Sequence, residues 1–372
     1  MTNIQMVDLK RQYSRLQKEI DTAVSRVLHS CRFVHGPEVQ QLAREVEKYL
    51  GVAHAIPCAS GTDALMLCLM ALEIQPGDEV ITTPFTFIAT AEAISLVGAT
   101  PVFVDIDEQT LTLRPDLLSE AVTARTRAII PVHLYGQSAD LKPVLEVARR
   151  HQLKVVEDAA QALGTEYCGR KVGTWGDLAA VSFYPGKNLG AYGDAGMVLT
   201  NHSSLAEKVR MLADHGSRKR YLHEYIGLNS RLDALQAAIL RVKLPYLDEW
   251  NQRRRDIARR YRERLEKLPL TFQRLPEYST HIYHQFVIRT PRRDELQVFL
   301  QKRGISTAIH YPLPVHLQPA FRQRYGFREG MFPVAEKVAG EVLSLPMHPD
   351  LTEEEIRTVI ETIEQFFHQQ AG

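Results

Sequence analysis

Lys187 is the residue whose surroundings most clearly allow chemistry. It follows the apolar segment 179–183 and precedes a glycine-rich loop, 190–196. A lysine in this setting can form an imine with an aldehyde cofactor. Gly186 and Lys187 superficially match the end of a phosphate-binding P-loop, but residue 188 is Asn instead of Ser or Thr, and no glycine lies five residues before Gly186. We therefore expect a lysine that carries a cofactor and not a P-loop.

Asp158 ends another apolar segment, 154–158. A carboxylate at the end of a buried strand is costly unless it meets a cation or hydrogen-bond donors. A protonated pyridine nitrogen is such a partner, and the salt link would keep the ring able to withdraw electrons. The same residue could simply cap the next helix, and this segment alone does not separate the two interpretations.

Two further segments follow apolar runs in the same way. Gly61 and Thr62 open a helix whose free amide groups could hold a phosphate, although small residues at a helix start are often plain caps. Phe87 could stack on a flat heteroaromatic ring or belong to the hydrophobic core. Each of these segments is a weak signal alone, and only their order along the chain indicates a common site.

The elements that must position these residues are short apolar strands alternating with helices. Helices are expected first at 9–30 and 39–50. Strands then follow at 55–58, 79–82, 101–105, 128–132, 154–158, 179–183 and 196–200, with helices at 62–72, 89–97 and 141–151. This alternation predicts an α/β fold with a doubly wound, mainly parallel sheet. Ligands of such sheets bind at the carboxyl ends of the strands, where the candidate residues stand.

The second part of the chain has a different pattern. A long, highly charged helix is expected at 233–268, and then an α+β appendage with a strand at 284–288 and helices at 294–303 and 353–368. We predict two domains: residues 1–245, with the N-terminal helix and a large cofactor-binding domain, and residues 246–372, with the linking helix and a small domain. The basic run 253–255 is interpreted as a solvated helix face and not as a polyanion site.

Composition excludes several other classes of protein. The 372 residues carry 45 basic and 44 acidic side chains, so neither nucleic acid nor an anionic membrane is an expected partner. The four cysteines have no metal-binding spacing, and no metal site is expected. We find no signal peptide and no apolar stretch of the roughly 20 residues that span a bilayer. A cytoplasmic protein is therefore expected.

Taken together, the ordered segments resemble the fold type I aminotransferases and, more narrowly, the DegT/StrS-type family of sugar-nucleotide aminotransferases. The similarity covers nearly the whole chain. The matching segments are 6–9, 60–65, 76–81, 157–161, 173–177, 182–196, 227–233, 310–312 and 345–349. Ala195 departs from the pattern, because relatives often carry glycine there, which puts the geometry of that loop in question. The resemblance implies a large domain with the doubly wound sheet and a smaller α+β C-terminal domain.

The resemblance implies roles for the matched residues around pyridoxal 5'-phosphate (PLP). Lys187 would hold the cofactor as a Schiff base and move the proton between carbon centres, and Asp158 would pair with the pyridine nitrogen. The other implied cofactor contacts are Gln161 at the ring hydroxyl, Phe87 on the ring face, Gly61, Thr62 and Ser182 at the phosphate, and Asn229, which would reach the phosphate of a second subunit. The implied sugar-nucleotide contacts are Arg231, His310 and Tyr311, although Arg231 could instead form a helix-start ion pair with Asp233.

The implied reaction is a transamination in a homodimer with shared active sites. Glutamate would convert PLP to pyridoxamine 5'-phosphate, which would aminate a keto group on a nucleotide-linked hexose. The product would be an amino sugar for surface polysaccharide or secondary metabolism.

Two segments favour amination at C-3 over C-4 of the sugar. Ser230 stands where C-4-aminating relatives often carry an aromatic residue, so it would leave room for the sugar, and the stretch 309–319 looks like the C-3 group. The alternative is that Ser230 caps the helix from Leu232 onward and that His310 and Tyr311 merely shape their loop.

Two other functions fit the same fold. Sugar dehydratases of this family replace the lysine with histidine, so Lys187 argues against that activity. A regulatory or sensory protein that has lost catalysis is the second alternative. The intact set of Lys187, Asp158, Gln161 and Asn229 argues against it, and no helix-turn-helix pattern accompanies a basic patch.

Overall fold

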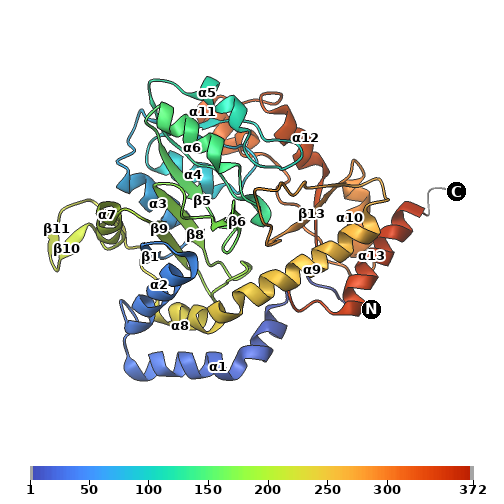
Figure 1. Cartoon of the computed structure of the whole chain (residues 1–372), viewed down its shortest axis with the longest axis horizontal. Coiled ribbons are helices and arrows are strands. Elements are labelled where there is room, and N and C mark those ends of the chain that lie inside the picture. The colour runs from blue at the N-terminus through green and yellow to red at the C-terminus, as the bar shows by residue number, and fades with distance from the viewer. Residues whose placement is uncertain (1–2, 369–372) are drawn as a thin grey trace.

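A seven-stranded sheet with helices on both faces forms the centre of the computed structural model, which describes residues 3–368 (Figure 1). The strand order is β1-β9-β8-β5-β4-β2-β3. Neighbours from β8 to β3 are parallel, while β9 runs antiparallel to both β1 and β8. The bounds are β1 His54–Cys58, β2 Glu79–Thr82, β3 Thr100–Phe103, β4 Thr126–Ile129, β5 Lys154–Asp158, β8 Leu178–Ser182 and β9 Gly196–Thr200. The predicted doubly wound, mainly parallel sheet is confirmed.

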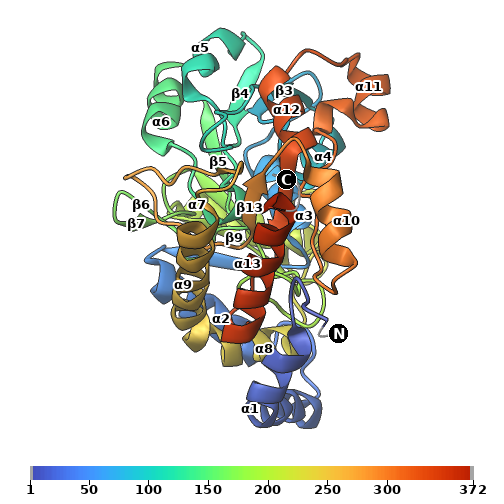
Figure 2. The same cartoon turned by 90° about the vertical axis from the view of Figure 1, so that its right-hand side faces the viewer.

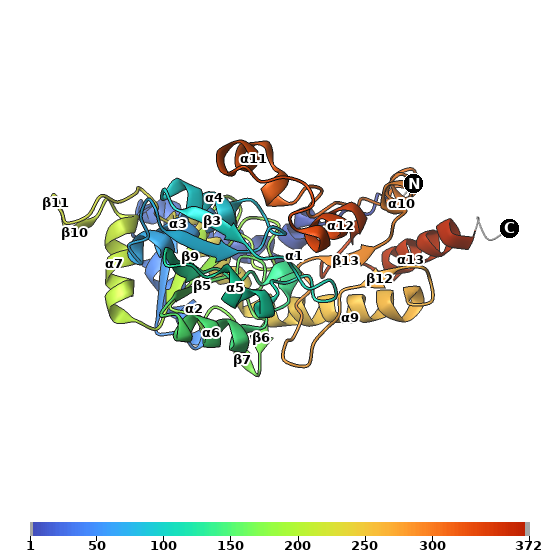
Figure 3. The ribbon, with the colours of Figure 1, turned by 90° about the horizontal axis from the view of Figure 1, so that it is seen from above.

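Helices cover both faces of this sheet, so its central strands are apolar on both sides. Figure 3 shows α3 and α4 on one face and α2 and α6 on the other. The helix α3 buries most of its circumference in a core that includes Leu65, Leu67, Leu69 and Val209. The bounds are α2 Pro37–Leu50, α3 Gly61–Ala71, α4 Ala89–Leu96, α5 Leu118–Ala121, α6 Leu141–Arg150 and α7 Ser203–Ala213.

The N-terminal helix α1 spans Leu9–Ser30, as the apolar spacing predicted. Asp8 begins it by accepting a hydrogen bond from the Arg11 amide at 3.0 Å, which is the usual role of an N-cap carboxylate. Its buried stripe includes Leu16 and Ile20, which pack near Trp250. Met1 and Thr2, at the start of the segment expected to hold no signal peptide, lie outside the described residues.

The single long helix predicted at 233–268 is wrong, because the chain forms two helices there. The first, α8, spans Ala234–Lys243, and the second, α9, spans Leu247–Leu265. A 3₁₀ turn at Leu244–Tyr246 separates them. Pro245 lies in this turn, and proline cannot donate the backbone hydrogen bond that a continuous helix needs. The helix α9 then runs beside the C-terminal helix α13, Glu353–His368 (Figures 1 and 2).

The C-terminal part contains a second, three-stranded antiparallel sheet, as expected for an α+β appendage. Ile4, near the start of the chain, pairs with Ile305 and is buried in the same core. The bounds are β12 Thr271–Phe272, β13 Phe286–Arg289, β14 Val342–Leu345, α10 Arg293–Gln301, α11 Pro319–Tyr325 and α12 Pro333–Glu341. The division into 1–245 and 246–372 stays a prediction. Within residues 3–368, no helix is both long and apolar enough to cross a membrane.

Two short hairpins complete the fold. One joins β6 Glu166–Tyr167 to β7 Arg170–Lys171, and the other joins β10 Ser217–Lys219 to β11 Leu222–His223. The second hairpin projects from the body of the molecule at the end opposite α13 (Figures 1 and 3).

The basic run 253–255 is not a uniformly solvated helix face, so that expectation is wrong for its middle residue. Arg254 is only 3% exposed, and its guanidinium donates to the backbone carbonyls of Met347 at 2.8 Å and Tyr283 at 3.0 Å. Burial lowers the pKa of Arg254 to about 10. This cation therefore ties α9 to the segments on either side of the C-terminal sheet.

Replacing Arg254 with methionine should lower the free energy of unfolding by about 2–4 kcal/mol, because buried carbonyls would lose their donor. Urea unfolding followed by circular dichroism measures the change. The control is Arg259→Met on the same helix, where an exposed ion pair with Asp256 is lost and the change should stay below about 1 kcal/mol. Equal losses in the two variants would contradict the structural role of Arg254.

Candidate active site

The loop that carries Lys187 is closed on itself between β8 and β9. The amide of Phe183 donates to the carbonyl of Ala195, and the amide of Ala191 donates back to the carbonyl of Phe183, both at 2.8 Å. A Cβ at Gly190 would lie 2.3 Å from the carbonyl oxygen of Pro185, so only glycine fits there. Ala195 is buried and has no positive φ, so the departure from glycine leaves the loop intact.

Lys187 lies near Asp158, at the carboxyl ends of the adjacent parallel strands β8 and β5. The Asp158 carboxylate is buried and accepts hydrogen bonds from the Thr90 hydroxyl at 2.7 Å and the Ala160 amide at 3.2 Å. Burial raises the pKa of Asp158, while the bond from Thr90 and the charge of Lys187 act against the rise. Burial lowers the pKa of Lys187 to about 8, against the opposing charge of Asp158. The two groups are therefore close enough for each to stabilise the charge of the other.

Gln161 links the large sheet to the C-terminal part of the site. Its Oε1 accepts from the amide of Tyr135 at 2.7 Å, and its Nε2 donates to the hydroxyl of Tyr311 at 2.9 Å. The ring of Phe87 lies 5.9 Å from that of Tyr311, and Phe87 is 53% exposed. The core interpretation of Phe87 is therefore wrong, and an aromatic face stays open at the site.

His310 joins the same group from the C-terminal part. Its Nδ1 lies 2.8 Å from the hydroxyl of Ser344, and the hydroxyl of Tyr135 donates to its carbonyl. Burial and then the charge of Lys187 lower the pKa of His310 to about 4, so it is a neutral hydrogen-bonding group near neutral pH. The structure thus gathers Lys187, Asp158, Gln161, Phe87, His310 and Tyr311, which are spread over more than 200 residues of sequence.

The start of α3 forms a cradle that fits a phosphate. Ser60 is the cap, because its hydroxyl accepts from the Asp63 amide at 3.0 Å. Among the residues that the structure describes, neither the Gly61 nor the Thr62 amide donates a hydrogen bond. A Cβ at Gly61 would lie 2.7 Å from the Cβ of Ser182, so the cradle needs glycine. Ser60 therefore caps the helix while the amides of Gly61 and Thr62 stay available, and these donors fit a phosphate.

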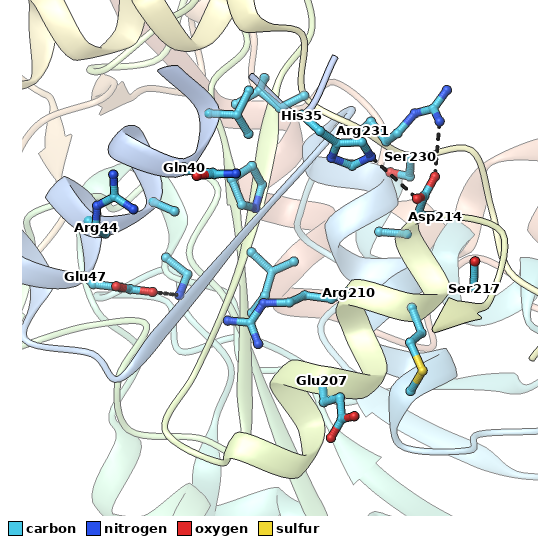
Figure 4. Close-up of a pocket in the computed structure, with 18 of the residues that line it drawn as sticks. His35, Gln40, Arg44, Glu47, Glu207, Arg210, Asp214, Ser217, Ser230 and Arg231 are labelled. Carbon is cyan, nitrogen blue, oxygen red and sulfur yellow. Dashed lines mark hydrogen bonds and ion pairs between the residues drawn. The ribbon is translucent and has the colours of Figure 1, made fainter. Parts of the chain in front are cut away.

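Asn229 and Arg231 do not join this group within the chain. Asn229 is exposed and pairs through its backbone with Asp214, and the Arg231 guanidinium lies 3.1 Å from the carboxylate of the same Asp214. The ion pair with Asp233 considered from the sequence is therefore wrong. Arg231 instead lines a pocket of about 500 Å³ between α2, β1 and α7 (Figure 4). None of the residues that line this pocket belongs to the group around Lys187.

Ser230 is fully buried and does not cap the following helix. Its hydroxyl donates to the Asp63 carboxylate at 2.6 Å and accepts from the Ala59 amide at 3.2 Å. The N-cap residue of α8 is Asp233. Ser230 therefore fastens the 229–231 segment to the loop before α3, and the room that its small side chain would leave for the sugar stays a prediction.

Three residues around the site gave no usable signal in the sequence. Thr90 looks like one more polar residue in α4, yet it binds Asp158. Tyr135 has a φ of 60° in a short 3₁₀ turn that local spacing did not reveal. Lys243 would be taken for a surface residue of a charged helix, but it is fully buried, and its Nζ donates to the carbonyl of Gly190 at 2.6 Å.

Amine labelling at varied pH tests the electrostatics of the site. Without any ligand, Lys187 should react with an amine-specific reagent with a midpoint at about pH 8, because only the neutral amine is nucleophilic. In Asp158→Asn the midpoint should fall further, since the charge that favours the ammonium is lost. Peptide mapping follows the site, with the exposed Lys154 as internal control. A midpoint for Lys187 near the ordinary lysine value of 10.5 would contradict the assignment.

Comparison with known proteins gives the same picture. A model of the DegT/DnrJ/EryC1/StrS aminotransferase family matches residues 14–364. The chain is 49% identical to the "pleiotropic regulatory protein" of Geobacillus stearothermophilus over 368 residues, 98% of this chain and 99% of that protein. It is 47% identical to the UDP-N-acetyl-3-dehydro-alpha-D-glucosamine 3-aminotransferase of Acidithiobacillus ferrooxidans over 367 residues, 99% of each.

Solved structures agree with the sequence comparison. The crystal structure of Streptomyces venezuelae DesV in complex with a ketimine intermediate matches with a TM-score of 0.96 and 47% identity, covering 98% of this chain and 99% of that one. Structures of further relatives contain PMP or are in a PLP form. The family model spans nearly the whole described chain, and the site holds the lysine, the carboxylate and the anion cradle together. This chain belongs to the DegT/DnrJ/EryC1/StrS aminotransferase family.

Proposed function

We propose that this protein is a PLP-dependent aminotransferase that uses glutamate to aminate C-3 of a nucleotide-linked 3-keto-hexose. The observation that carries the proposal is the juxtaposition of Lys187 and Asp158 beside a helix start with free amides. The relatives are named as transaminases of UDP- and dTDP-linked sugars, several of them at C-3. The product would serve surface polysaccharide or secondary metabolism.

Lys187 and Asp158 divide the catalytic work in this proposal. When bound, PLP supplies an aldehyde carbon and a ring that withdraws electrons. Lys187, with its pKa lowered to about 8, holds a proton loosely enough to take it from one carbon and return it to another near neutral pH. Asp158 would pair with the ring nitrogen, and Thr90 fixes the direction of that carboxylate.

The remaining residues bind and orient. Gly61, Thr62 and Ser182 fit the phosphate, because two free amides and a hydroxyl meet at the start of α3. Gln161 would hold the ring hydroxyl, and the open face of Phe87 would receive the ring. These assignments rest on the geometry of this chain and on the family resemblance.

His310 and Tyr311 are proposed for the sugar side of the site. Tyr311 is hydrogen-bonded to Gln161, His310 lies close enough to Lys187 to feel its charge, and both carry groups that can hydrogen-bond a hexose. Sites built from such groups discriminate strongly, because a misplaced sugar hydroxyl leaves buried partners unpaired. Their contacts with Gln161 and Ser344 also shape the loop, so the two roles are compatible here.

A homodimer with shared sites accounts for Asn229 and Arg231. Both lie apart from their own Lys187, shortly after the exposed apolar side chains of the projecting hairpin and the segment that follows it, which are Tyr221, Leu222, Tyr225 and Ile226. Ile226 is 95% exposed and Tyr221 is 81% exposed. Exposed apolar side chains on a projecting hairpin are typical of an interface. A second copy seated there would receive Asn229 at its phosphate and Arg231 at its sugar nucleotide. The cytoplasmic location expected from the sequence stays a prediction.

A non-catalytic, regulatory function is the second candidate for this chain, because one relative is named as a regulatory protein. In this chain burial raises the pKa of Asp158 and lowers that of Lys187, and a buried amine beside a buried carboxylate is not needed by a purely regulatory fold. The sugar dehydratase alternative requires a residue other than lysine at position 187. The turnover assay below separates these functions.

With glutamate and a panel of nucleotide sugars, the purified protein should turn over 3-keto substrates with a higher kcat/KM than 4-keto substrates. Lys187→Ala should abolish turnover, because no amine remains to bind the cofactor or move the proton. Borohydride reduction of the PLP-loaded protein followed by peptide mapping should place the cofactor on Lys187. A label on Lys243, a second buried lysine with a lowered pKa, would overturn the site. Preference for 4-keto sugars would overturn only the C-3 assignment.

Mixed dimers test the sharing of sites. A dimer of one Lys187→Ala subunit and one Asn229→Ala subunit should regain activity, because one of its two sites receives both wild-type residues. The control pairs Lys187→Ala with Asp158→Asn, which both belong to the same half of the site, so neither site is repaired. Equal inactivity of the two mixtures, or an active monomer in sedimentation, would contradict the contribution of Asn229 to a neighbouring subunit.

A further inference from the structure

Glu157, the residue before Asp158, is a fully buried carboxylate that the proposed reaction does not use. Its Oε1 accepts from the amides of Trp175 at 2.7 Å and Gly176 at 2.8 Å. Its Oε2 accepts from the amide of Gly173 at 2.7 Å and from Nε2 of His133 at 3.0 Å. Burial acts to raise the pKa of Glu157, but the bonds from His133 and the backbone outweigh it, so the pKa lies below its ordinary value. The group is therefore ionised, with four donors.

The hydrogen bonds of His133 determine its tautomer. The amide of Ala139 donates to Nδ1 at 3.1 Å, so this nitrogen must carry a lone pair and not a proton. The proton of the neutral ring then lies on Nε2, which donates it to Glu157. The imidazole is fully buried between these two partners, so its orientation is fixed on both sides.

The backbone of the same short segment holds both proposed ring contacts. The amide of His133 donates to the carbonyl of Asp158 at 3.0 Å, and the amide of Asp158 donates to the carbonyl of Pro131 at 2.9 Å. Two residues further on, the amide of Tyr135 donates to Oε1 of Gln161. Successive side chains of a strand point to opposite faces, so Glu157 lies behind the sheet while Asp158 faces the site.

We infer that the buried Glu157–His133 pair is a positioning unit that sets the place of Asp158 and Gln161 against the cofactor ring. This inference rests on the proposed function for its effect on catalysis. Glu157, on β5, binds the backbone of the 173–176 loop and the side chain of His133. The orientation of His133 in turn fixes the 131–135 segment, whose backbone is hydrogen-bonded to Asp158 and Gln161. Neither residue touches the reacting atoms, so neither is catalytic.

His133→Phe is the decisive variant, because it removes the bond to Glu157 without removing a charge. In protein without cofactor, the pH midpoint of Lys187 labelling should fall in the direction of Asp158→Asn, since a displaced carboxylate supports the ammonium less. His133→Gln keeps an amide donor and should restore the midpoint towards the wild-type value. The matched control is His151→Phe, an exposed position after α6, which should change nothing.

In the loaded enzyme, His133→Phe should lower kcat by about ten- to hundredfold, the range expected when a group is misplaced by about 1 Å, with little change in KM for the sugar nucleotide. The cofactor should also dissociate more readily. If His133→Phe does not fold, His133→Asn, which is too short to reach Glu157, takes its place in every measurement.

A folded variant with the wild-type labelling midpoint and the wild-type kcat would overturn the inference. Failure of the proposed function would look different, because the wild-type protein itself would then show no transamination. The labelling midpoint does not depend on that activity and would still test the pair.

Discussion

The rest of the site depends on one interaction, the attraction between the amine of Lys187 and the carboxylate of Asp158 at the ends of two adjacent strands. The strands β5 and β8 are parallel neighbours, so Asp158 and the loop of Lys187 necessarily meet at the same edge of the sheet. Burial disfavours the charged form of both groups, and each lessens that penalty for the other. A cofactor with a cationic ring nitrogen would pair with the buried carboxylate, and its aldehyde would react with the buried amine.

The surrounding structure keeps these two groups in place from several directions. Thr90 holds the carboxylate in front of the sheet, and Glu157 anchors the same strand behind it. Lys243 holds the carbonyl of Gly190 and so closes the far end of the Lys187 loop. The C-terminal part adds Tyr311 to the site through its hydrogen bond with Gln161. Within that part, Arg254 holds α9 to the segments that flank β13 and β14.

Local patterns predicted the parts of this structure that local physics controls. The helix at 9–30, the strands of the large sheet and the place of Lys187 and Asp158 at strand ends all follow from apolar spacing. The errors arise where a distant partner decides. The burial of Arg254 depends on carbonyls about 30 and 90 residues away along the chain. Ser230 is held by a hydrogen bond to Asp63. Arg231 forms its ion pair with Asp214 and not with the nearby Asp233. Pro245 is the exception, because its effect on a helix is local and readable in the sequence.

We propose that the charge of Asp158 keeps the cofactor ring protonated beside Lys187. Nitrogen NMR of protein reconstituted with PLP carrying ¹⁵N in the ring measures this protonation directly. We expect a protonated ring nitrogen in the wild-type protein at pH 8, and an unprotonated one in Asp158→Asn under the same conditions. The same chemical shift in both proteins, whether protonated or not, would contradict the account.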